Sequence, residues 1–389
     1  MKKIAVVTTT RAEYGLLAPI IKRLRDFENP DLKVELIVSG THLYEEFGMT
    51  VNEIKAQSVR IDHEVLIPVN SYGAVDISNN QAVALGKFAQ LFSKEKYSAL
   101  LILGDRYEML AVAIAASNAR IPIFHISGGD VTEGALDDCI RHAITKMSYL
   151  HFTTNEESRK RVIQLGEEPD RVFNYGSTSI DNVLNMATMS KKEAMDSVGI
   201  KRELYVLCTY HPVTLESGNI KENMDNFLAA IKSFDNIDFI VTKSNADQGG
   251  EEINRILDEA DIEIQNLYVY SSLGVKRYLS LMKYAQFVLG NSSSGIVEAP
   301  AFHIPTVNIG DRQRGRLQAE SIINCNSDYS SIVTAIEKAL SVEMKNICKT
   351  INSPYGDGHS AKRVVKKIIE AIGRPIDLKK KFFDFEVNV

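Results

Sequence analysis

Short apolar runs alternate with amphipathic segments along almost the whole chain. Runs such as residues 4–9, 99–103 and 237–242 are rich in Val, Ile and Leu, which is typical of strands buried on both faces of a parallel sheet. Between such runs, segments such as residues 79–94 repeat apolar residues at the spacing of an amphipathic helix. The alternation therefore predicts an α/β protein with parallel sheets.

The predicted elements fall into two blocks. Strands are predicted at residues 4–9, 34–39, 99–103, 121–126, 150–154, 171–175, 204–209, 237–242, 266–270, 287–289 and 304–309. Helices are predicted at residues 16–25, 79–94, 108–119, 136–147, 220–233, 251–259, 275–283, 329–340 and 361–372. A stretch rich in Met, Lys and Ser at residues 185–192 is interpreted as a linker. The pattern predicts two doubly wound, Rossmann-like domains that face a central cleft, covering residues 1–182 and 183–372, followed by a tail of residues 373–389.

Composition narrows the possible function classes. The chain has 389 residues, 44% of them hydrophobic, and a net charge of -5, so its charge gives no reason to expect nucleic acid. The four cysteines are far apart and form no metal-binding pattern, which favours reduced thiols in the cytoplasm over disulfides or a zinc site. The apolar run near the N-terminus is too short for a signal peptide, and no segment is long enough to span a membrane. We therefore expect a soluble, cytoplasmic protein without a metal.

The clustered ionisable residues lie in the stretch from 99 to 147. Asp105 and Arg106 come directly after the first predicted strand of this stretch, and Asp130 follows the second strand after a glycine pair. Asp137 lies at the start of the next predicted helix. Because ligands of open α/β sheets bind outside the carboxyl ends of the strands, these side chains are expected near one crevice. The stretch is predicted to carry an active site.

Two polar segments at other strand ends are weaker candidates. Residues 8–15, which include Arg11 and Gly15, form a predicted turn between the first strand and the first helix, where a phosphate can bind. The segment has no GxGxxG or Walker lysine pattern, so NAD or ATP is not expected as a cofactor. His211 follows a buried strand of the second block. For both Arg11 and His211, a purely structural role stays open.

A serine-rich loop is the most specific signal. Residues 290–295 read Gly-Asn-Ser-Ser-Ser-Gly and precede a predicted helix start, where Ser292, Ser293 and backbone N–H groups can bind a diphosphate. Glu298 is expected in the first turn of that helix, where it either complements the helix dipole or accepts hydrogen bonds from ribose hydroxyls. Three arginines within residues 312–316 follow another strand end and either neutralise the same diphosphate or form a solvated loop. Together these features predict a nucleoside diphosphate site in the second domain.

These motifs together resemble those of the UDP-N-acetylglucosamine 2-epimerases, in particular the hydrolysing branch that opens bacterial sialic and legionaminic acid synthesis. The resemblance covers nearly the whole chain, and it is carried by Thr8-Thr-Thr-Arg-Ala-Glu-Tyr-Gly15, Gly104-Asp-Arg-Tyr-Glu108, Gly128-Gly129, Asp137-Asp-Cys-Ile-Arg-His142, His211-Pro212, Gly290-Asn-Ser-Ser-Ser-Gly295 with Glu298, and Gly310-Asp-Arg-Gln313. It implies the two-domain GT-B architecture, with the last helix packing back on the first domain. It also implies a UDP-sugar substrate, no cofactor, and a homodimer or homotetramer.

The implied reaction removes the C2 proton of an N-acetyl hexosamine as the anomeric diphosphate leaves, and water then adds to the resulting glycal. This chemistry needs a positioned base and strong electrostatic support for the leaving group. By resemblance, Asp105 is a catalytic carboxylate, Asp137 is a second acid or base, and His211 bridges the leaving group and proton transfer. The implied nucleotide-binding residues are Arg11, Gly15, Arg106, Ser292, Ser293, Glu298 and Arg312.

One position departs from the sialic-pathway pattern. Ser127 stands before the glycine pair, where such members have a glutamate. A serine cannot replace a carboxylate as a base near neutral pH. Either Asp130 or Glu133 takes over that role, or the activity is weakened, or the substrate differs from UDP-N-acetylglucosamine. The leading substitute is a UDP-2,4-diacetamido-2,4,6-trideoxy sugar.

Three alternatives stay open at this point. A non-hydrolysing 2-epimerase would share most motifs, but residues 40–48 are similar to the hydrolysing branch and lack the Gln-His-x-Glu-Met run that reversible epimerases carry there. A retaining GT-B glycosyltransferase would share the fold and the diphosphate site, but it has no need of the paired carboxylates Asp105 and Asp137. A non-catalytic sensor of sugar nucleotides would bind without turnover, and Ser127 makes it conceivable.

Overall fold

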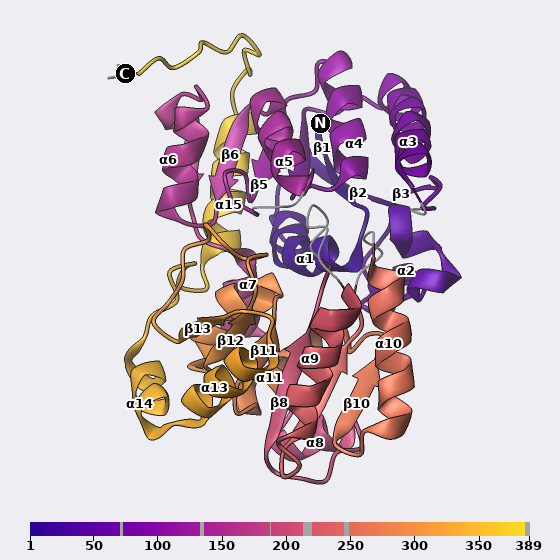
Figure 1. Ribbon diagram of the computed structural model, residues 1–389. Coiled ribbons are helices and arrows are strands. Elements are labelled where there is room, and N and C mark those ends of the chain that lie inside the picture. Colours follow the sequence, from indigo (N-terminus) through magenta and orange to yellow (C-terminus); the bar gives the residue numbers. More distant parts are fainter. Residues whose placement is uncertain (71–72, 133–135, 187, 213–219, 245–248, 386–389) are drawn as a thin grey trace. The chain divides into compact units, whose positions relative to one another are not determined.

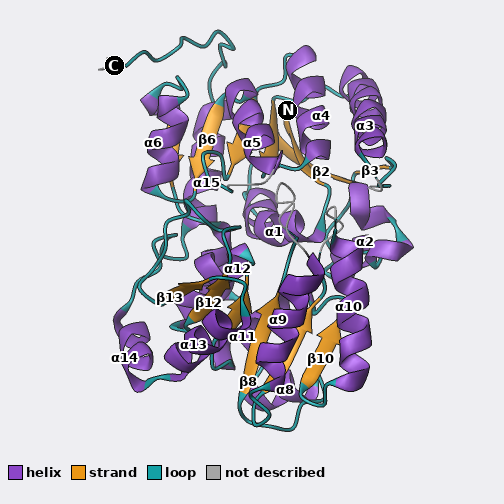
Figure 2. Cartoon of the chain, viewed as in Figure 1, coloured by secondary structure: helices purple, strands orange, loops and turns teal. Residues whose placement is uncertain are grey.

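The computed structural model describes residues 1–389 except 71–72, 133–135, 187, 213–219, 245–248 and 386–389. The chain forms two compact units. The first unit contains Met1–Asp130, Asp137–Asn182 and Tyr355–Val389, and the second contains Val131–Leu136 and Val183–Pro354. Helices and strands alternate through both units, as Figures 1 and 2 show. None of the described helices is long and apolar enough to cross a membrane.

The first unit is built on a parallel sheet with the strand order β3-β2-β1-β4-β5-β6-β7. Its strands are β1 (Lys2–Thr8), β2 (Leu32–Ser39), β3 (His63–Val65), β4 (Ala99–Leu103), β5 (Ile123–Ile126), β6 (Leu150–Thr153) and β7 (Val172–Asn174). Its helices are α1 (Arg11–Arg25), α2 (Val51–Ala56), α3 (Ala74–Lys94), α4 (Tyr107–Asn118), α5 (Leu136–Met147), α6 (Glu156–Gln164) and α15 (Ser360–Ile372), and α7 (Thr178–Asn185) runs across the boundary of the units. The order changes direction between β1 and β4, which makes this a doubly wound sheet.

The second unit repeats this plan with the strand order β10-β9-β8-β11-β12-β13, again parallel throughout. Its strands are β8 (Tyr205–Thr209), β9 (Asp238–Thr242), β10 (Leu267–Tyr270), β11 (Val288–Gly290), β12 (Thr306–Ile309) and β13 (Ile322–Cys325). Its helices are α8 (Lys191–Asp196), α9 (Ile220–Lys232), α10 (Gly250–Glu263), α11 (Gly274–Tyr284), α12 (Ser293–Val297), α13 (Tyr329–Leu340) and α14 (Val342–Thr350). Here the order changes direction between β8 and β11. The prediction of two doubly wound α/β sheets is confirmed.

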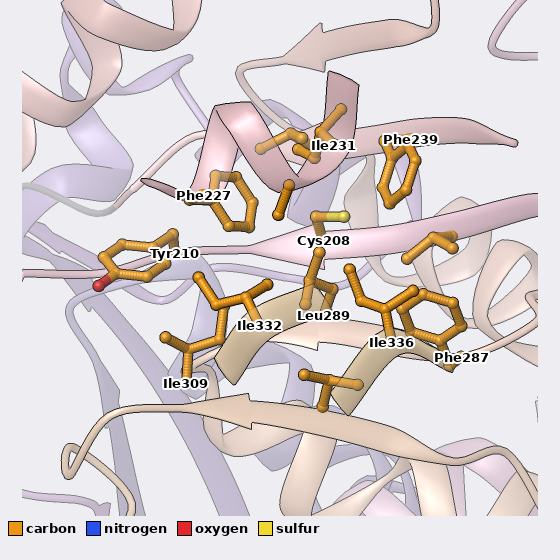
Figure 3. Packing of buried hydrophobic residues seen from close by; sticks show 14 of the residues in the cluster. Cys208, Tyr210, Phe227, Ile231, Phe239, Phe287, Leu289, Ile309, Ile332 and Ile336 are labelled. Carbon is orange, nitrogen blue, oxygen red and sulfur yellow. The ribbon is translucent and has the colours of Figure 1, made fainter. Parts of the chain in front are cut away.

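Each sheet is buried by helices on both faces, which is why its strands are apolar along their whole length. In β1, Ile4 and Val6 pack towards α1 and α15, whereas Ala5 and Val7 pack towards α3 and α4. In the second unit, Figure 3 shows β8 and its neighbours packed against α9 and α13, with Cys208 in the middle of the apolar cluster. Burial of this kind contributes roughly 25 cal/mol per Å² of apolar surface removed from water.

The C-terminal segment belongs to the first unit. The apolar side of α15 packs on α1, so the expectation that the last helix packs back on the first domain is confirmed. The predicted boundary of 183–372 differs from this result, because Tyr355–Val389 groups with the first unit. Lys380 reaches the carboxylate of Glu167 at 2.8 Å, and Phe383 covers a small apolar cluster at α6 and β7. Contacts with residues far away in the sequence therefore place the C-terminal segment in the first unit.

Sequence patterns located the central elements well and the peripheral ones poorly. The strand predicted at 99–103 and the helices predicted at 136–147 and 329–340 have these bounds in the structure. Residues 11–15, predicted as a turn, instead form the first turns of α1. The helix begins at Arg11 because Thr10 and Glu13 form a capping box. The short edge strands β3 and β13 and the helices α2, α6 and α14 were not predicted.

Candidate active site

The first candidate cluster lies at the point where the order of the first sheet changes direction. Strands β1 and β4 are neighbours, with Val6 opposite Leu101, so the loops after Thr8 and after Leu103 leave the sheet side by side. One loop leads to Arg11 and the other carries Asp105. Ligands of doubly wound sheets bind at such a point, outside the carboxyl ends of the strands.

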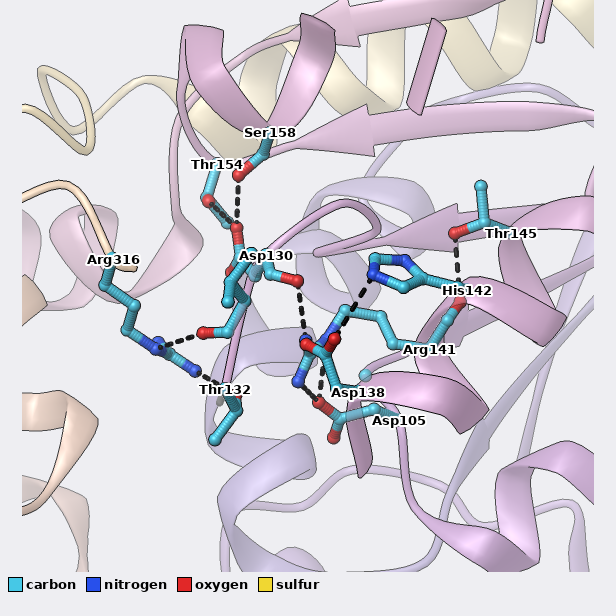
Figure 4. A network of polar contacts seen from close by, with 12 residues as sticks. Asp105, Asp130, Thr132, Asp138, Arg141, His142, Thr145, Thr154, Ser158 and Arg316 are labelled. Carbon is cyan, nitrogen blue, oxygen red and sulfur yellow. Dashed lines mark hydrogen bonds and ion pairs between the residues drawn. The ribbon is translucent and has the colours of Figure 1, made fainter. Parts of the chain in front are cut away.

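Asp105 is held by an arginine that is almost completely buried. Arg141, on α5, donates from Nε to Oδ2 of Asp105 at 2.9 Å and also from Nη2 to the same oxygen. Its Nη1 donates to Oδ1 of Asp138 at 2.8 Å and to the backbone carbonyl of Asp130 at 2.6 Å. Figure 4 shows the guanidinium of Arg141 between these partners. The buried guanidinium therefore fixes the orientation of the Asp105 carboxylate at the end of β4.

Packing requires a glycine at position 129, directly before Asp130. Gly129 has a φ of 81°, and a Cβ there would collide with the backbone oxygen of Ser158. The chain therefore passes close to α6, and Oδ1 of Asp130 accepts hydrogen bonds from Thr154 at 2.7 Å and Ser158 at 2.6 Å. These bonds orient the Asp130 side chain. Ser127 also has a positive φ, of 64°.

The two other predicted carboxylates, Asp137 and Glu133, lie at the start of α5 and in the segment before it. Asp137 is half-buried in the first turn of α5. Its neighbour Asp138 bonds Arg141 and lies 3.4 Å from Nε2 of His142. Burial lowers the pKa of His142, although Asp138 opposes this shift. Glu133 lies outside the described residues.

The predicted phosphate ligands of the first unit have different surroundings. Burial lowers the pKa of Arg11, at the start of α1, and Glu53 partly opposes this effect. Gly15 lies inside α1, where its carbonyl accepts a hydrogen bond from Asn182 at 2.7 Å. Arg106 donates to both carboxylate oxygens of the buried Glu108, at 3.2 and 3.4 Å. Arg106 is thus anchored by an ion pair at the base of the loop that carries Asp105.

The second unit has its own cluster at the equivalent position, between β8 and β11. Gly290 pairs with Thr209, and a Cβ at Gly290 would collide with the Thr209 carbonyl, so only glycine permits this approach. Asn291 then bridges to the β8 loop: its Oδ1 accepts from the backbone N–H of His211 at 2.7 Å, and its Nδ2 donates to the His211 carbonyl at 2.8 Å. The His211 ring is buried, with Nδ1 3.1 Å from the hydroxyl of Ser244.

Glu298 is placed differently from the prediction. Helix α12 covers only Ser293–Val297, and Glu298 caps its C-terminal end rather than lying in its first turn. A carboxylate there cannot complement the helix dipole, so that structural interpretation was wrong. Burial raises the pKa of Glu298 to about 7, and the hydroxyl of Ser294 donates to its Oε2. The same burial raises the pKa of the neighbouring Tyr278 to about 12, with Glu298 adding to the shift.

Ser292 and the arginine loop complete this cluster. Ser292 is the N-cap of α12, and its hydroxyl accepts a hydrogen bond from the backbone of Ser294 at 3.3 Å. Arg312 donates from Nη1 to the Asn291 carbonyl at 3.2 Å, which places it beside the serine-rich loop. The other two arginines of the loop have different surroundings, and Arg314 agrees with the solvated-loop alternative. Arg314 is exposed and pairs with Asp311, and Arg316 bonds Val131 and Thr132.

Ser244 and Tyr278 were not singled out by the sequence interpretation. Arg141, Asn291 and Gln313 lie in the quoted motifs, but they were assigned no role. The spacing of Asp138 and Arg141, three residues apart on one helix, was a usable signal for a local ion pair. The partnership of Arg141 with Asp105 spans elements far apart in sequence and had no local signal. Within the described residues, no group of three or more His, Cys, Asp or Glu side chains could hold a metal ion.

Comparisons with known proteins agree with the sequence motifs. The family model of the UDP-N-acetylglucosamine 2-epimerases matches residues 25–369. The chain is 38% identical to the polysialic acid biosynthesis protein P7 of Escherichia coli, with 95% of each chain covered. It is also 38% identical to the GDP/UDP-N,N'-diacetylbacillosamine 2-epimerase (hydrolyzing) of Campylobacter jejuni, covering 98% of this chain and 99% of the relative.

A solved structure shows the same fold. The UDP-GlcNAc 2-epimerase of Neisseria meningitidis, bound to UDP-GlcNAc, superposes with a TM-score of 0.80 at 19% identity, covering 95% of this chain and all of the other. At this identity the likeness establishes the architecture, which is GT-B-like. The family match and the two relatives establish membership. The chain belongs to the UDP-N-acetylglucosamine 2-epimerase family.

Proposed function

We propose that the protein is a hydrolysing sugar-nucleotide 2-epimerase, which converts a UDP-linked 2-acetamido sugar with the gluco configuration into UDP and the free manno sugar for nonulosonate synthesis. Membership of the family and the hydrolysing relative from Campylobacter jejuni support this function. The observation that carries it is the Asp105–Arg141 network at the switch point of the first sheet. An ionised carboxylate fixed in one orientation is what proton abstraction from carbon requires.

The reaction divides into an elimination and an addition. A carboxylate base takes the C2 proton, the electron pair of the C2–H bond forms a C1=C2 double bond, and the C1–O bond breaks with its electrons on UDP. Water then adds its oxygen to C1, and an acid delivers a proton to the opposite face of C2. We assign the carboxylate roles to Asp105 and Asp137, with Asp130 or Glu133 in the place of the glutamate that Ser127 replaces.

The second unit would hold the leaving group. The hydroxyls of Ser292 and Ser293 and the guanidinium of Arg312 would bind the diphosphate, and Glu298 would accept hydrogen bonds from the ribose. His211 is buried, its backbone is bonded by Asn291, and its ring lies beside Ser244. We assign to this ring the transfer of a proton to the departing oxygen. Charged and hydroxyl donors aimed at a developing diphosphate are the usual source of leaving-group stabilisation.

The substrate that we favour is the UDP-2,4-diacetamido-2,4,6-trideoxy sugar. Two considerations support it over UDP-N-acetylglucosamine. A relative at 38% identity carries N,N'-diacetylbacillosamine in its name, and Ser127 departs from the sialic-pathway pattern. A retaining glycosyltransferase is disfavoured, since the clustered carboxylates around Arg141 have no role in transfer to an acceptor.

A panel of sugar nucleotides tests this function. UDP and GDP derivatives of N-acetylglucosamine and of the 2,4-diacetamido sugar are incubated with the enzyme alone in heavy water. We expect UDP release and a free manno sugar that carries deuterium at C2, both read by proton NMR. A free sugar with its original hydrogen and configuration at C2 would mean simple hydrolysis. An epimeric sugar still attached to UDP would mean the non-hydrolysing reaction, and binding without turnover would mean a sensor.

The oligomeric state and the cellular compartment are further parts of this proposal. We propose a homodimer or homotetramer in the cytoplasm. The four cysteines are unpaired, as expected for a reducing compartment, although Cys139 is exposed. Sedimentation equilibrium and cell fractionation test the two statements, and a monomer or a secreted protein would contradict them.

A further inference from the structure

Three consecutive backbone carbonyls in the loop between β5 and α5 each accept a hydrogen bond from a different arginine. The loop is the one that links the glycine pair to α5. The donors come from α6, from α5 and from the loop after β12. The pairs are Arg161 with Gly129, Arg141 with Asp130, and Arg316 with Val131.

Arg316 makes the most distant of these contacts along the chain. Its Nε donates to the Val131 carbonyl at 3.1 Å, and its Nη2 donates to the hydroxyl of Thr132 at 3.2 Å. Figure 4 shows its guanidinium directed at this backbone. Thr132 is only 4% exposed, so the hydroxyl and the guanidinium meet away from bulk water. Two of the nitrogens of Arg316 are thus engaged by protein acceptors rather than offered to a diphosphate.

The two residues that Arg316 holds come directly after a candidate carboxylate, Asp130. Residues Val131–Leu136 group with the second unit, to which Arg316 also belongs. Asp130, which directly precedes Val131, groups with the first unit. Arg316 and Arg312 lie in one loop, and Arg312 contacts the serine-rich loop. The loop of residues 312–316 therefore contacts both the serine-rich loop and the two residues that follow Asp130.

We propose that Arg316 is a positioning residue of the reaction: it holds Val131 and Thr132 so that the adjoining Asp130 keeps the geometry needed for proton transfer. The inference rests on the proposed function and assigns Arg316 a role distinct from that of Arg312. Misplacement of a catalytic group by about 1 Å costs about a hundredfold in rate. Loss of Arg316 should therefore reduce turnover without weakening nucleotide binding.

The test compares variants of the full-length enzyme. Steady-state kcat and KM are measured by UDP release from the sugar nucleotide that the wild type turns over, and UDP affinity is measured by calorimetry. For Arg316→Ala we expect kcat to fall about tenfold to a hundredfold, with the UDP dissociation constant within about twofold of wild type. Arg316→Lys should recover part of kcat, because an ammonium can reach one of the two acceptors. Arg255→Ala, on the exposed surface of α10, is the matched control and should change neither quantity.

A second variant keeps the inference testable if Arg316→Ala fails to fold. Thr132→Val removes only the hydroxyl and retains the arginine, and it should reduce kcat about threefold to tenfold at unchanged UDP affinity. Wild-type kcat in both variants would overturn the inference. A tenfold or greater loss of UDP affinity in Arg316→Ala would also overturn it, in favour of direct diphosphate binding. Failure of the proposed function would appear differently, as a wild-type enzyme that releases UDP from no member of the panel.

Discussion

Replacing Arg141 by lysine tests whether the buried network positions Asp105. The arginine side chain is 2% exposed, and it makes two hydrogen bonds to Asp105, one to Asp138 and one to the carbonyl of Asp130. A lysine keeps the charge but lacks the planar fork, so its ammonium can reach only one of these carboxylates. The substitution therefore removes the geometry of the network while leaving its charge in place.

The expected cost follows from the contacts that are lost. Two charge-assisted hydrogen bonds at about 1.5–3 kcal/mol each would give about 3–6 kcal/mol. The carboxylates of Asp105 and Asp138 are each 28% exposed, so water replaces part of the loss. We therefore expect the first unit to lose about 2–4 kcal/mol of unfolding free energy. Because Asp105 loses its fixed orientation, turnover should fall about a hundredfold at unchanged UDP affinity.

The assay must resolve the first unit from the second. The chain has no tryptophan, so urea unfolding is followed by far-UV circular dichroism, and hydrogen exchange of peptides within residues 99–130 and 137–147 reports the first unit alone. Arg363→Lys is the control. Arg363 also binds a carboxylate with two nitrogens: its Nη1 and Nη2 donate to Oδ1 and Oδ2 of Asp357 at 2.8 and 2.6 Å, but both side chains are exposed. An exposed pair of this kind contributes less than about 1 kcal/mol. If Arg141→Lys behaved like this control in exchange and in turnover, the network would not position Asp105.

Three further predictions concern individual residues. Asp105→Asn should retain UDP affinity but lose about 10²–10⁴-fold in the rate of UDP release, and near-wild-type turnover would remove Asp105 from the mechanism. Arg312→Ala should weaken UDP binding by about 1.5–3 kcal/mol in calorimetry, and unchanged affinity would place Arg312 outside the site. Because burial raises the pKa of Glu298 from 4.5 to about 7, its contribution to stability is complete below the lower value and is lost as pH rises through the higher one. Glu298→Gln should remove this dependence, so urea midpoints measured from about pH 5 to pH 8 should fall less in the variant than in the wild type, and parallel curves would contradict the assignment.

Several features of this protein follow from its sequence alone. Strands buried on both faces must be apolar throughout, so the run at residues 99–103 and the alternation around it predicted the doubly wound sheets. Candidate residues at strand ends could also be found, because parallel strands bring their carboxyl ends to one edge. This is how Asp105, His211 and Ser292 were chosen, and the two sheets place them at the points where the strand order changes direction.

Other features were decided only by the tertiary structure. The edge strands β3 and β13 are short and partly exposed, so their local pattern is weak. Glu298 was expected at a helix start and instead closes a helix that ends one residue earlier. These errors concern local boundaries, which short-range patterns define only loosely.

The larger surprises come from contacts between distant segments. The sequence left two roles open for Arg316, a diphosphate contact or a solvated loop, whereas the folded chain bonds it to a residue 185 positions away in the sequence. Arg141 bonds Asp105, which lies 36 residues away in the sequence. Tyr355–Val389 belongs to the first unit, although it follows the second unit in the sequence. An arginine in the sequence is a donor that can bind several kinds of acceptor, and only the folded chain decides which acceptor lies within hydrogen-bond reach.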